Sequence, residues 1–349
     1  MKLHDYQDRA KREIIDRQRL IVVAEMGSGK TLLTLKAIEE LGCKAWIFAP
    51  LRIASTVWSD EIEKFNLPLT ISRVVGTTAQ RKKALAVDAD IYITNFENVP
   101  WLYGEIGVLD DDVMIVIDES SRVKNPKGRR LKVLHKMIDR TERRVGLTGT
   151  PAPQGPMDLF SQVKTIIGPV WGKSFYRWRT QFFHAVDPNG FIWKPFPGSV
   201  EAITQQFADL SYKVDYDLDV PSTNLIDKVT LPPAAMRQYK EMEAEAIIEL
   251  KELGPVAAFD PLSQMMKCRQ LAGGTIYDEM GDHEVIHRAK LDAVKDIAAD
   301  SGENLLIGYQ FRSELALLKE QWPDAPVLGG GTSATEGAEI MKRWNRGEV

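Results

Sequence analysis

Residues 24–31 combine the residue types that bind phosphate groups in many nucleotide-binding proteins. Their sequence, Ala-Glu-Met-Gly-Ser-Gly-Lys-Thr, follows an apolar run at 20–24 that is typical of a buried parallel strand. It precedes a stretch at 31–41 with apolar residues at helical spacing. A helix that begins here directs its free N–H groups toward a ligand in the loop. We therefore expect a phosphate-binding loop, with Ala24 where the usual pattern has Gly.

Individual residues of this loop suit separate tasks in nucleotide binding. Gly27 and Gly29 allow the backbone to wrap closely around phosphate, and Ser28 lies between them. Lys30 can reach the outer phosphates, which makes it a candidate both for binding and for catalysis. The Thr31 hydroxyl can bind Mg²⁺.

An acidic pair, Asp118 and Glu119, follows the apolar run at 113–117. Open α/β sheets bind ligands at the carboxyl ends of their strands. There, Asp118 would hold Mg²⁺ through water, and Glu119 would polarise the attacking water. The loop and the acidic pair together predict a nucleotide triphosphatase. The alternative, a Gly-rich turn and an unrelated acidic pair, leaves the positions of Lys30 and Thr31 unexplained.

The bulk composition is that of a soluble globular protein. The chain has 349 residues, of which 44% are hydrophobic and 27% are charged, so two or more domains are expected. No apolar run is long enough to span a bilayer, and the N-terminus lacks the apolar core of a signal peptide. The two cysteines, Cys43 and Cys268, lack metal-ligand spacing, which favours a reducing compartment. We therefore expect a cytoplasmic protein with no membrane partner.

The net charge of −4 does not indicate a nucleic-acid-binding protein, but the charge is unevenly distributed. Between residues 122 and 144, ten Lys or Arg residues accompany only two acidic ones. Such an excess attracts phosphate backbones. The alternative is a solvated helix face, and the sequence leaves both open.

The first 165 residues alternate apolar runs with amphipathic stretches, which predicts an α/β fold with a parallel sheet. The expected strands are 20–24, 45–49, 71–75, 90–94, 113–117 and 144–148. The expected helices are 4–17, 30–41, 54–65, 78–86, 128–139 and 156–166. The polar turns after several strands would meet at one edge of the sheet.

The rest of the chain changes character twice. Aromatic and basic residues crowd 168–200, which favours the core of a small inserted subdomain over a base-stacking surface. Helices are expected at 234–253, 261–272, 288–299, 312–321 and 335–346, with strands at 304–308 and 326–330. We divide the chain into a first domain at 1–165, a mostly helical insertion at 166–287 and an incomplete second α/β domain at 288–349.

Several blocks, in this order, resemble those of the Swi/Snf-type ATPases of helicase superfamily two. They are L-H-D-Y-Q at 3–7, A-E-M-G-S-G-K-T at 24–31, the block at 47–65, I-Y-I-T-N-F-E-N at 91–98, D-E-S-S-R-V-K-N at 118–125, G-L-T-G-T-P at 146–151, L-L-I-G-Y-Q-F at 305–311 and L-G-G-G-T-S at 328–333. The resemblance implies RecA-like domains, with the helical stretch at 265–272 in an insertion before the second one.

The resemblance also implies roles for single residues. Gln7 would read adenine. Thr148 and Thr150 would link hydrolysis to DNA movement, and Ser121, which replaces the family's His, would share that coupling. The implied contacts with the DNA backbone are Arg52, Thr94, Lys124, Thr332 and Ser333.

The implied function is an ATP-dependent translocase on double-stranded DNA, using ATP and Mg²⁺. A strand-separating RNA or DNA helicase is one alternative. A DNA-binding module without hydrolysis is another, because two later family blocks, including the arginines that reach the γ-phosphate, do not follow. We therefore expect an N-terminal part of a longer ATPase. Its compactness resembles phage and bacterial members, so we expect the cytoplasm of a bacterium or an infected host. The biological process, the direction of movement and the oligomeric state stay open.

Overall fold

The computed structural model describes residues 3–187, 190–216, 224–252, 260–278, 280–302 and 304–348. The chain divides into two compact units. The first unit comprises Met1–Val186 and Ile192–Val220, and the second comprises Asp187–Phe191 and Pro221–Val349. Each unit is described by itself.

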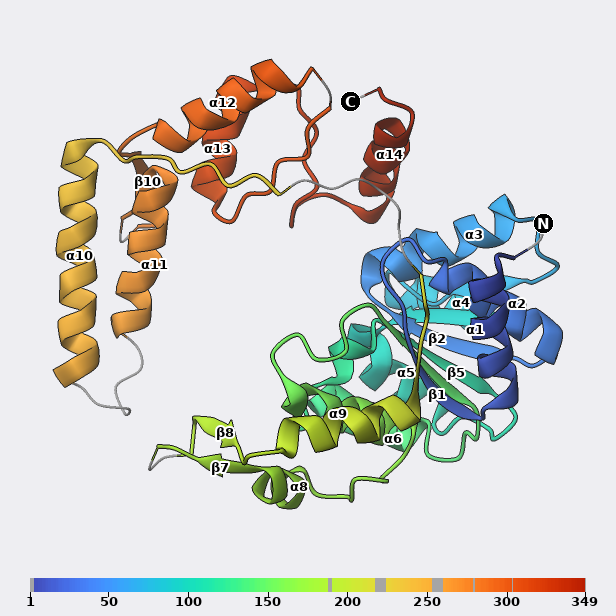
Figure 1. The fold of residues 1–349 in the computed structure, drawn as a ribbon. Helices are drawn as coiled ribbons and strands as arrows, with labels where there is room; N and C mark the ends of the chain where they lie inside the picture. Colours follow the sequence, from blue (N-terminus) through green and yellow to red (C-terminus); the bar gives the residue numbers. More distant parts are fainter. Residues whose placement is uncertain are drawn as a thin grey trace. The chain divides into compact units, whose positions relative to one another are not determined.

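A seven-stranded parallel sheet forms the centre of the first unit, in the order β3-β4-β2-β5-β6-β1-β9 (Figure 1). Its strands are β1 Arg19–Val23, β2 Ala45–Ala49, β3 Ile71–Arg73, β4 Ile91–Asn95, β5 Met114–Asp118, β6 Arg144–Thr148 and β9 Ser211–Lys213. All six strands predicted for the first 165 residues are present, and β9 was not predicted. Val23 pairs with Thr148, and Asp118 with Leu147, so β1, β5 and β6 end level at one edge.

Side chains alternate between the two faces of the sheet, and helices cover both faces (Figure 1). Leu20 and Val22 face a core shared with α1 (Asp5–Asp16), α2 (Lys30–Leu41) and α3 (Trp58–Lys64). Ile21 faces the opposite core, which contains residues of α5 (Val99–Ile106), α6 (Arg129–Met137), α7 (Leu159–Ile166), α8 (Phe175–Phe182) and α9 (Ser199–Leu210). A short α4 spans Thr78–Leu85, and a π-helical turn at Ile53–Val57 leads into α3. Both faces of the sheet are therefore buried, and this packing fixes the positions of the residues at the carboxyl ends of its strands.

The aromatic region after α7 contributes to this second core. Trp178 is 3% exposed, and its ring stacks on Trp171 with 5.5 Å between centroids. Phe160 of α7 also contacts Trp178, and Phe183 begins a hairpin of β7 (Phe183–Ala185) and β8 (Trp193–Pro195). Trp178 and Phe183 are therefore core residues, as expected, but the core they join is that of the first unit's sheet and not that of a separate subdomain.

Two cations of the basic segment stabilise the ends of helices. The Arg143 guanidinium donates hydrogen bonds to the carbonyls of Ile14, Ile15 and Arg17, where α1 ends. Arg144 is buried, and its guanidinium donates to the carbonyls of Ile138, Asp139, Thr141 and Thr165. These carbonyls lie at or next to the carboxyl ends of α6 and α7, where a helix leaves acceptors unpaired. The local excess of positive charge is therefore partly structural.

Helices make up most of the second unit. They are α10 Pro233–Glu252, α11 Asp260–Gly273, α12 Ala289–Ser301, α13 Arg312–Gln321 and α14 Ala334–Asn345. An unpredicted hairpin joins β10 (Thr275–Tyr277) to β11 (His283–Val285). All five predicted helices of this part are present.

The two strands predicted at 304–308 and 326–330 were wrong, since the structure has no strand there. A strand needs a neighbour that accepts and donates its backbone hydrogen bonds, and among the described residues neither segment has one. Leu306 is accordingly 81% exposed instead of lying in a sheet. The expected boundaries at residues 165 and 287 stay a prediction, although β9 extends the first sheet beyond residue 165.

Within the described part of the chain, we find no helix long and apolar enough to cross a membrane.

Candidate nucleotide-binding site

The loop between β1 and α2 has the backbone geometry of an anion-binding turn. Gly27 and Gly29 have φ angles of 78° and 80°, a region that favours glycine. A Cβ atom on Gly29 would also clash with the Gln7 side-chain amide. The backbone N–H groups of Gly29, Lys30 and Thr31 find no acceptor among the described residues. The loop therefore offers a group of free donors at the start of α2, as a phosphate ligand requires.

Lys30 lies folded over this loop. Its Nζ donates to the carbonyl oxygens of Ala24 at 2.7 Å and Glu25 at 2.8 Å. Burial lowers the pKa of Lys30, whereas the charges of Asp118 and Glu119 act to raise it. Both acceptors are backbone carbonyls of the loop, so the ammonium group can exchange them for phosphate oxygens.

Gln7 ties the start of α1 to the same loop. Its Nε2 donates to the Ser28 carbonyl at 3.2 Å, and its Oε1 accepts from the His4 N–H at 3.1 Å. Gln7 and Ser28 are both buried, and the Ser28 hydroxyl donates to the Glu25 carbonyl. The structure thus places Gln7 beside the loop, while its contact with adenine stays a prediction.

Asp118 ends β5 in a buried position, where it meets a side chain that the sequence did not single out. The Trp58 indole Nε1 donates to Asp118 Oδ2 at 2.9 Å, and Trp58 is fully buried. Burial raises the pKa of Asp118, the Trp58 bond lowers it, and the Glu119 charge raises it. Trp58 lies within the block at 47–65, but no local pattern links it to a carboxylate that lies 60 residues later.

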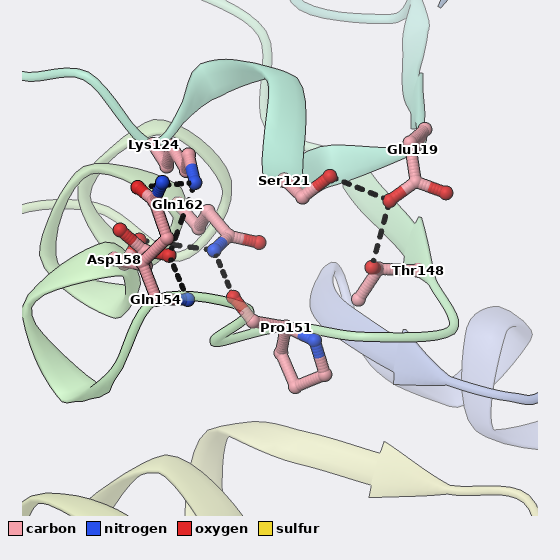
Figure 2. A network of polar contacts seen from close by, with 8 residues as sticks. All are labelled: Glu119, Ser121, Lys124, Thr148, Pro151, Gln154, Asp158 and Gln162. Carbon is pink, nitrogen blue, oxygen red and sulfur yellow. Dashed lines mark hydrogen bonds and ion pairs between the residues drawn. The ribbon is translucent and has the colours of Figure 1, made fainter. Parts of the chain in front are cut away.

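Glu119 adopts a left-handed backbone conformation, with φ of 59°. Such a conformation is strained for a residue with a side chain, and it often occurs at functional sites. Figure 2 shows Glu119 Oε1 accepting hydrogen bonds from Ser121 Oγ at 2.6 Å and Thr148 Oγ1 at 3.1 Å. The Thr150 N–H donates to Thr148 Oγ1 at 3.2 Å. The structure therefore brings the hydroxyls of Ser121 and Thr148 to the candidate catalytic carboxylate, and Thr150 bonds to Thr148.

A second network in Figure 2 joins the loop after β6 to α7. Gln162 Nε2 donates to the carbonyls of Pro151 and Asp158, and Gln162 Oε1 accepts from Ser120 Oγ at 2.7 Å. Gln162 is fully buried and was missed from the sequence, because only the fold brings Ser120 to it. It links the residue after Glu119 to the loop that follows Thr148 and contains Thr150.

The candidate DNA contacts of the first unit differ in exposure. Lys124 Nζ donates to Gln154 Oε1 at 2.9 Å and forms an ion pair with Asp158 at 3.2 Å. Thr94 is buried, and its hydroxyl donates to the Val74 carbonyl at 2.8 Å. Arg52 is exposed at the residue before the π-helical turn. Their contacts with DNA stay predictions.

The two candidates of the second unit lie around the start of α14. The Thr332 hydroxyl donates to the Val327 carbonyl at 2.6 Å and accepts from the Gly329 N–H at 3.0 Å. Ser333 is the N-cap of α14, and its hydroxyl accepts from the Glu336 N–H. Both hydroxyls thus stabilise local structure, and their contacts with DNA also stay predictions.

The oxygen ligands of the site suit Mg²⁺. The Thr31 hydroxyl has no hydrogen-bond partner in the described part of the chain, and Asp118 supplies a carboxylate at the same sheet edge. Mg²⁺ usually takes one or two protein oxygens, with substrate phosphates and water completing its shell. A dedicated cage of three or more acidic, His or Cys residues is absent from the described residues. The residues present therefore fit a magnesium ion that arrives with a nucleotide.

Comparison with known proteins places these features in context. Residues 8–207 match the model of the SNF2-related domain. A putative protein p41 of Acyrthosiphon pisum secondary endosymbiont phage 1 is 30% identical over 368 residues, covering 99% of this chain and 78% of that protein. The ATP-dependent helicase BRM of Arabidopsis thaliana is 28% identical over 182 residues, covering 48% of this chain but only 8% of that protein.

Among solved structures, the chain is similar to the SWI2/SNF2 ATPase core of Sulfolobus solfataricus in complex with double-stranded DNA. The TM-score is 0.54 at 21% sequence identity, covering 98% of this chain and 75% of that chain. At this identity the similarity shows the fold, and it confirms the predicted RecA-like class.

Proposed function

Because this chain belongs to the SNF2-related family, we propose that it is part of an ATP-driven motor that moves along double-stranded DNA. One observation supports this most directly. Glu119, which is suited to activate water, is bonded through its side chain to Thr148, in the block that the resemblance assigns to coupling. The p41 similarity extends over nearly the whole chain, and the solved relative of similar fold is described as bound to double-stranded DNA.

Different residues of the site have different roles in ATP hydrolysis. The N–H groups of the loop and the Lys30 ammonium group bind the phosphates, where they offset negative charge. Thr31 and Asp118 would hold Mg²⁺, which neutralises charge on the phosphate oxygens when it is bound. Glu119 orients a water molecule and takes its proton as the water attacks the γ-phosphate.

The hydrogen bonds to Glu119 offer a route from DNA to hydrolysis. Thr148 holds one oxygen of Glu119, and the loop after Thr148 is fixed by Gln162 of α7. A shift of this loop on DNA binding would move the Thr148 hydroxyl and so change where Glu119 points. Duplex DNA should therefore change the rate of hydrolysis more than the affinity for ATP.

The test compares ATP hydrolysis with and without duplex DNA. For the full-length protein we expect stimulation of hydrolysis by duplex DNA, and for Lys30→Ala we expect loss of nucleotide binding by calorimetry. Lys36→Ala is a matched control, since Lys36 lies on the same helix and, partly buried, pairs with Glu39. Equal hydrolysis with and without DNA would contradict the motor, and unchanged nucleotide affinity in Lys30→Ala would contradict the site.

A strand-displacement assay on RNA and DNA duplexes separates translocation from unwinding. Hydrolysis stimulated by a duplex that stays paired supports the translocase, whereas release of one strand would favour the helicase alternative.

A further inference from the structure

Helix α6 presents a stripe of three exposed cations: Arg129, Lys132 and Lys136. Their spacing of three and four residues places them on one face of the helix. The apolar residues Leu131, Leu134 and Met137 are buried in the core on the opposite face. Arg140, also exposed, follows four residues after Lys136. The stripe therefore faces solvent along the full length of α6.

These three cations have no acidic partner among the described residues, unlike two other cations of the same basic segment. Lys124 pairs with Asp158, and Arg130 pairs with Glu97 at 2.8 Å. Arg143 and Arg144 donate to backbone carbonyls. Among the cations of residues 122–144 that have no such partner in the described structure, Arg129, Lys132 and Lys136 make up half.

The first turn of α6 would be more stable with other residues, although Lys136 in the last turn suits the negative end of the helix. The first turn of α6 contains Arg129 and Arg130 and no acidic residue, although the positive end of a helix favours carboxylates. Like charges three or four residues apart, such as Lys132 and Lys136, also destabilise a helix. Local structure therefore does not explain Arg129 or the placing of Lys132 beside Lys136, whereas an external anion would.

The stripe begins next to a block already expected to face DNA. The ion pair between Arg130 and Glu97 joins the first turn of α6 to the short turn Phe96–Asn98, directly after β4. From Arg129 to Lys136 the helix rises about 10 Å, at about 1.5 Å per residue. One DNA strand carries a phosphate about every 3.4 Å along the axis, so the stripe matches about three phosphates.

We propose that the stripe of Arg129, Lys132 and Lys136 binds the phosphate backbone of double-stranded DNA, outside the blocks to which the resemblance assigns DNA contacts. This inference rests on the proposed function, because it assumes the same duplex as the track of the motor. The stripe contacts phosphates alone, so it adds affinity without sequence preference.

The salt dependence of duplex binding tests this surface. A fluorescent duplex of random sequence is titrated with each protein between about 50 and 200 mM salt, and the slope of log K against log salt is measured. Each lost phosphate contact reduces the slope by about 0.9, so Lys132→Gln/Lys136→Gln should lower it by about 1.8. The control Arg9→Gln/Lys83→Gln removes two other exposed cations and should keep the wild-type slope.

A second variant separates binding from stability. Arg129→Glu places a carboxylate at the positive end of α6, so its melting temperature should stay equal or rise while duplex affinity falls. A loss of stability would show that Arg129 is structural and would overturn the argument.

The outcomes also separate the two proposals. A wild-type chain that binds no duplex contradicts the motor and the stripe together. A wild-type chain that binds duplex with a slope unchanged in the Lys132→Gln/Lys136→Gln variant contradicts the stripe alone and leaves a solvated helix face.

Discussion

At the scale of single residues, the bond from Trp58 to Asp118 gives a direct prediction about magnesium. Trp58→Phe keeps an aromatic ring in the core but removes the N–H that orients the buried carboxylate. Partners that orient metal ligands typically change metal affinity by about 10- to 100-fold. We therefore expect the gain in ADP affinity on adding Mg²⁺ to fall about tenfold, measured by calorimetry with Mg²⁺ and with a chelator.

Trp178→Phe is the matched control for this measurement. Trp178 is also buried in the first unit, but its indole N–H has no hydrogen-bond partner within the part of the chain that the structure describes. This variant should keep the full effect of Mg²⁺. The assignment of Trp58 fails if both variants respond to Mg²⁺ as the wild-type chain does, or if Trp58→Phe weakens ADP equally without the metal.

The residues that the sequence predicted best are those whose neighbours along the chain define them. Lys30 and Thr31 follow directly from a strand, a Gly-rich turn and a helix, and the structure places them as expected at the start of α2. Trp58 was missed because its partner lies 60 residues away, and Gln162 because one of its partners, Ser120, lies 42 residues away. A sequence pattern reports local geometry, whereas these contacts arise from the order of strands in the sheet.

At the scale of elements, the contact between α6 and α7 makes stability depend on pH. His135 Nε2 lies 2.8 Å from Thr165 Oγ1, whose proton is donated to the Ser161 carbonyl, so the neutral imidazole must donate. Burial, followed by the charges of Lys164 and Arg144, lowers the pKa of His135 from 6.5 to about 4. The folded state thus favours the neutral ring.

The sign of this effect follows from proton linkage. Because the folded pKa lies below the unfolded one, the stabilisation is complete above about pH 6.5 and is lost as the pH falls toward 4. A shift of this size corresponds to about 3 kcal/mol of unfolding free energy. Urea unfolding of wild type and His135→Gln across this range checks it, since the amide can still donate. An equal loss of stability in both proteins would remove His135 as the cause.

Strands were predicted correctly where the sequence has a continuous apolar run with a neighbouring strand in the fold. They were missed or wrongly predicted where only pairing with another strand decides. β1 and β5 are buried on both faces of the sheet, so their continuous apolar runs predict strands from the sequence alone. The short β9 has no such run, and only its pairing with β1 makes it a strand. The segment at 304–308 has the apolar run but no partner among the described residues, so it forms no strand.

At the scale of the whole molecule, all residues that are candidates for binding the nucleotide lie in the first unit. The second unit has its own buried residues, which include Leu271, Leu291 and Leu317. Two units with separate cores should unfold in two calorimetric transitions, and a ligand stabilises only the unit that binds it. At a free Mg²⁺–ADP concentration of about 100 times Kd the gain is about 2.7 kcal/mol. For a unit of this size, that corresponds to about 5–10 °C in one transition.

The other transition should stay in place, and Lys30→Ala should show two transitions that are both insensitive to nucleotide. A single transition that moves as a whole would mean that the two units unfold together. If one transition of the Lys30→Ala variant still moved when nucleotide was added, the binding site would lie outside the loop at 24–31. Lys30 is half-buried, so replacing it changes the stability of the unit even without nucleotide. The shift of the variant is therefore measured from its own melting temperature without nucleotide.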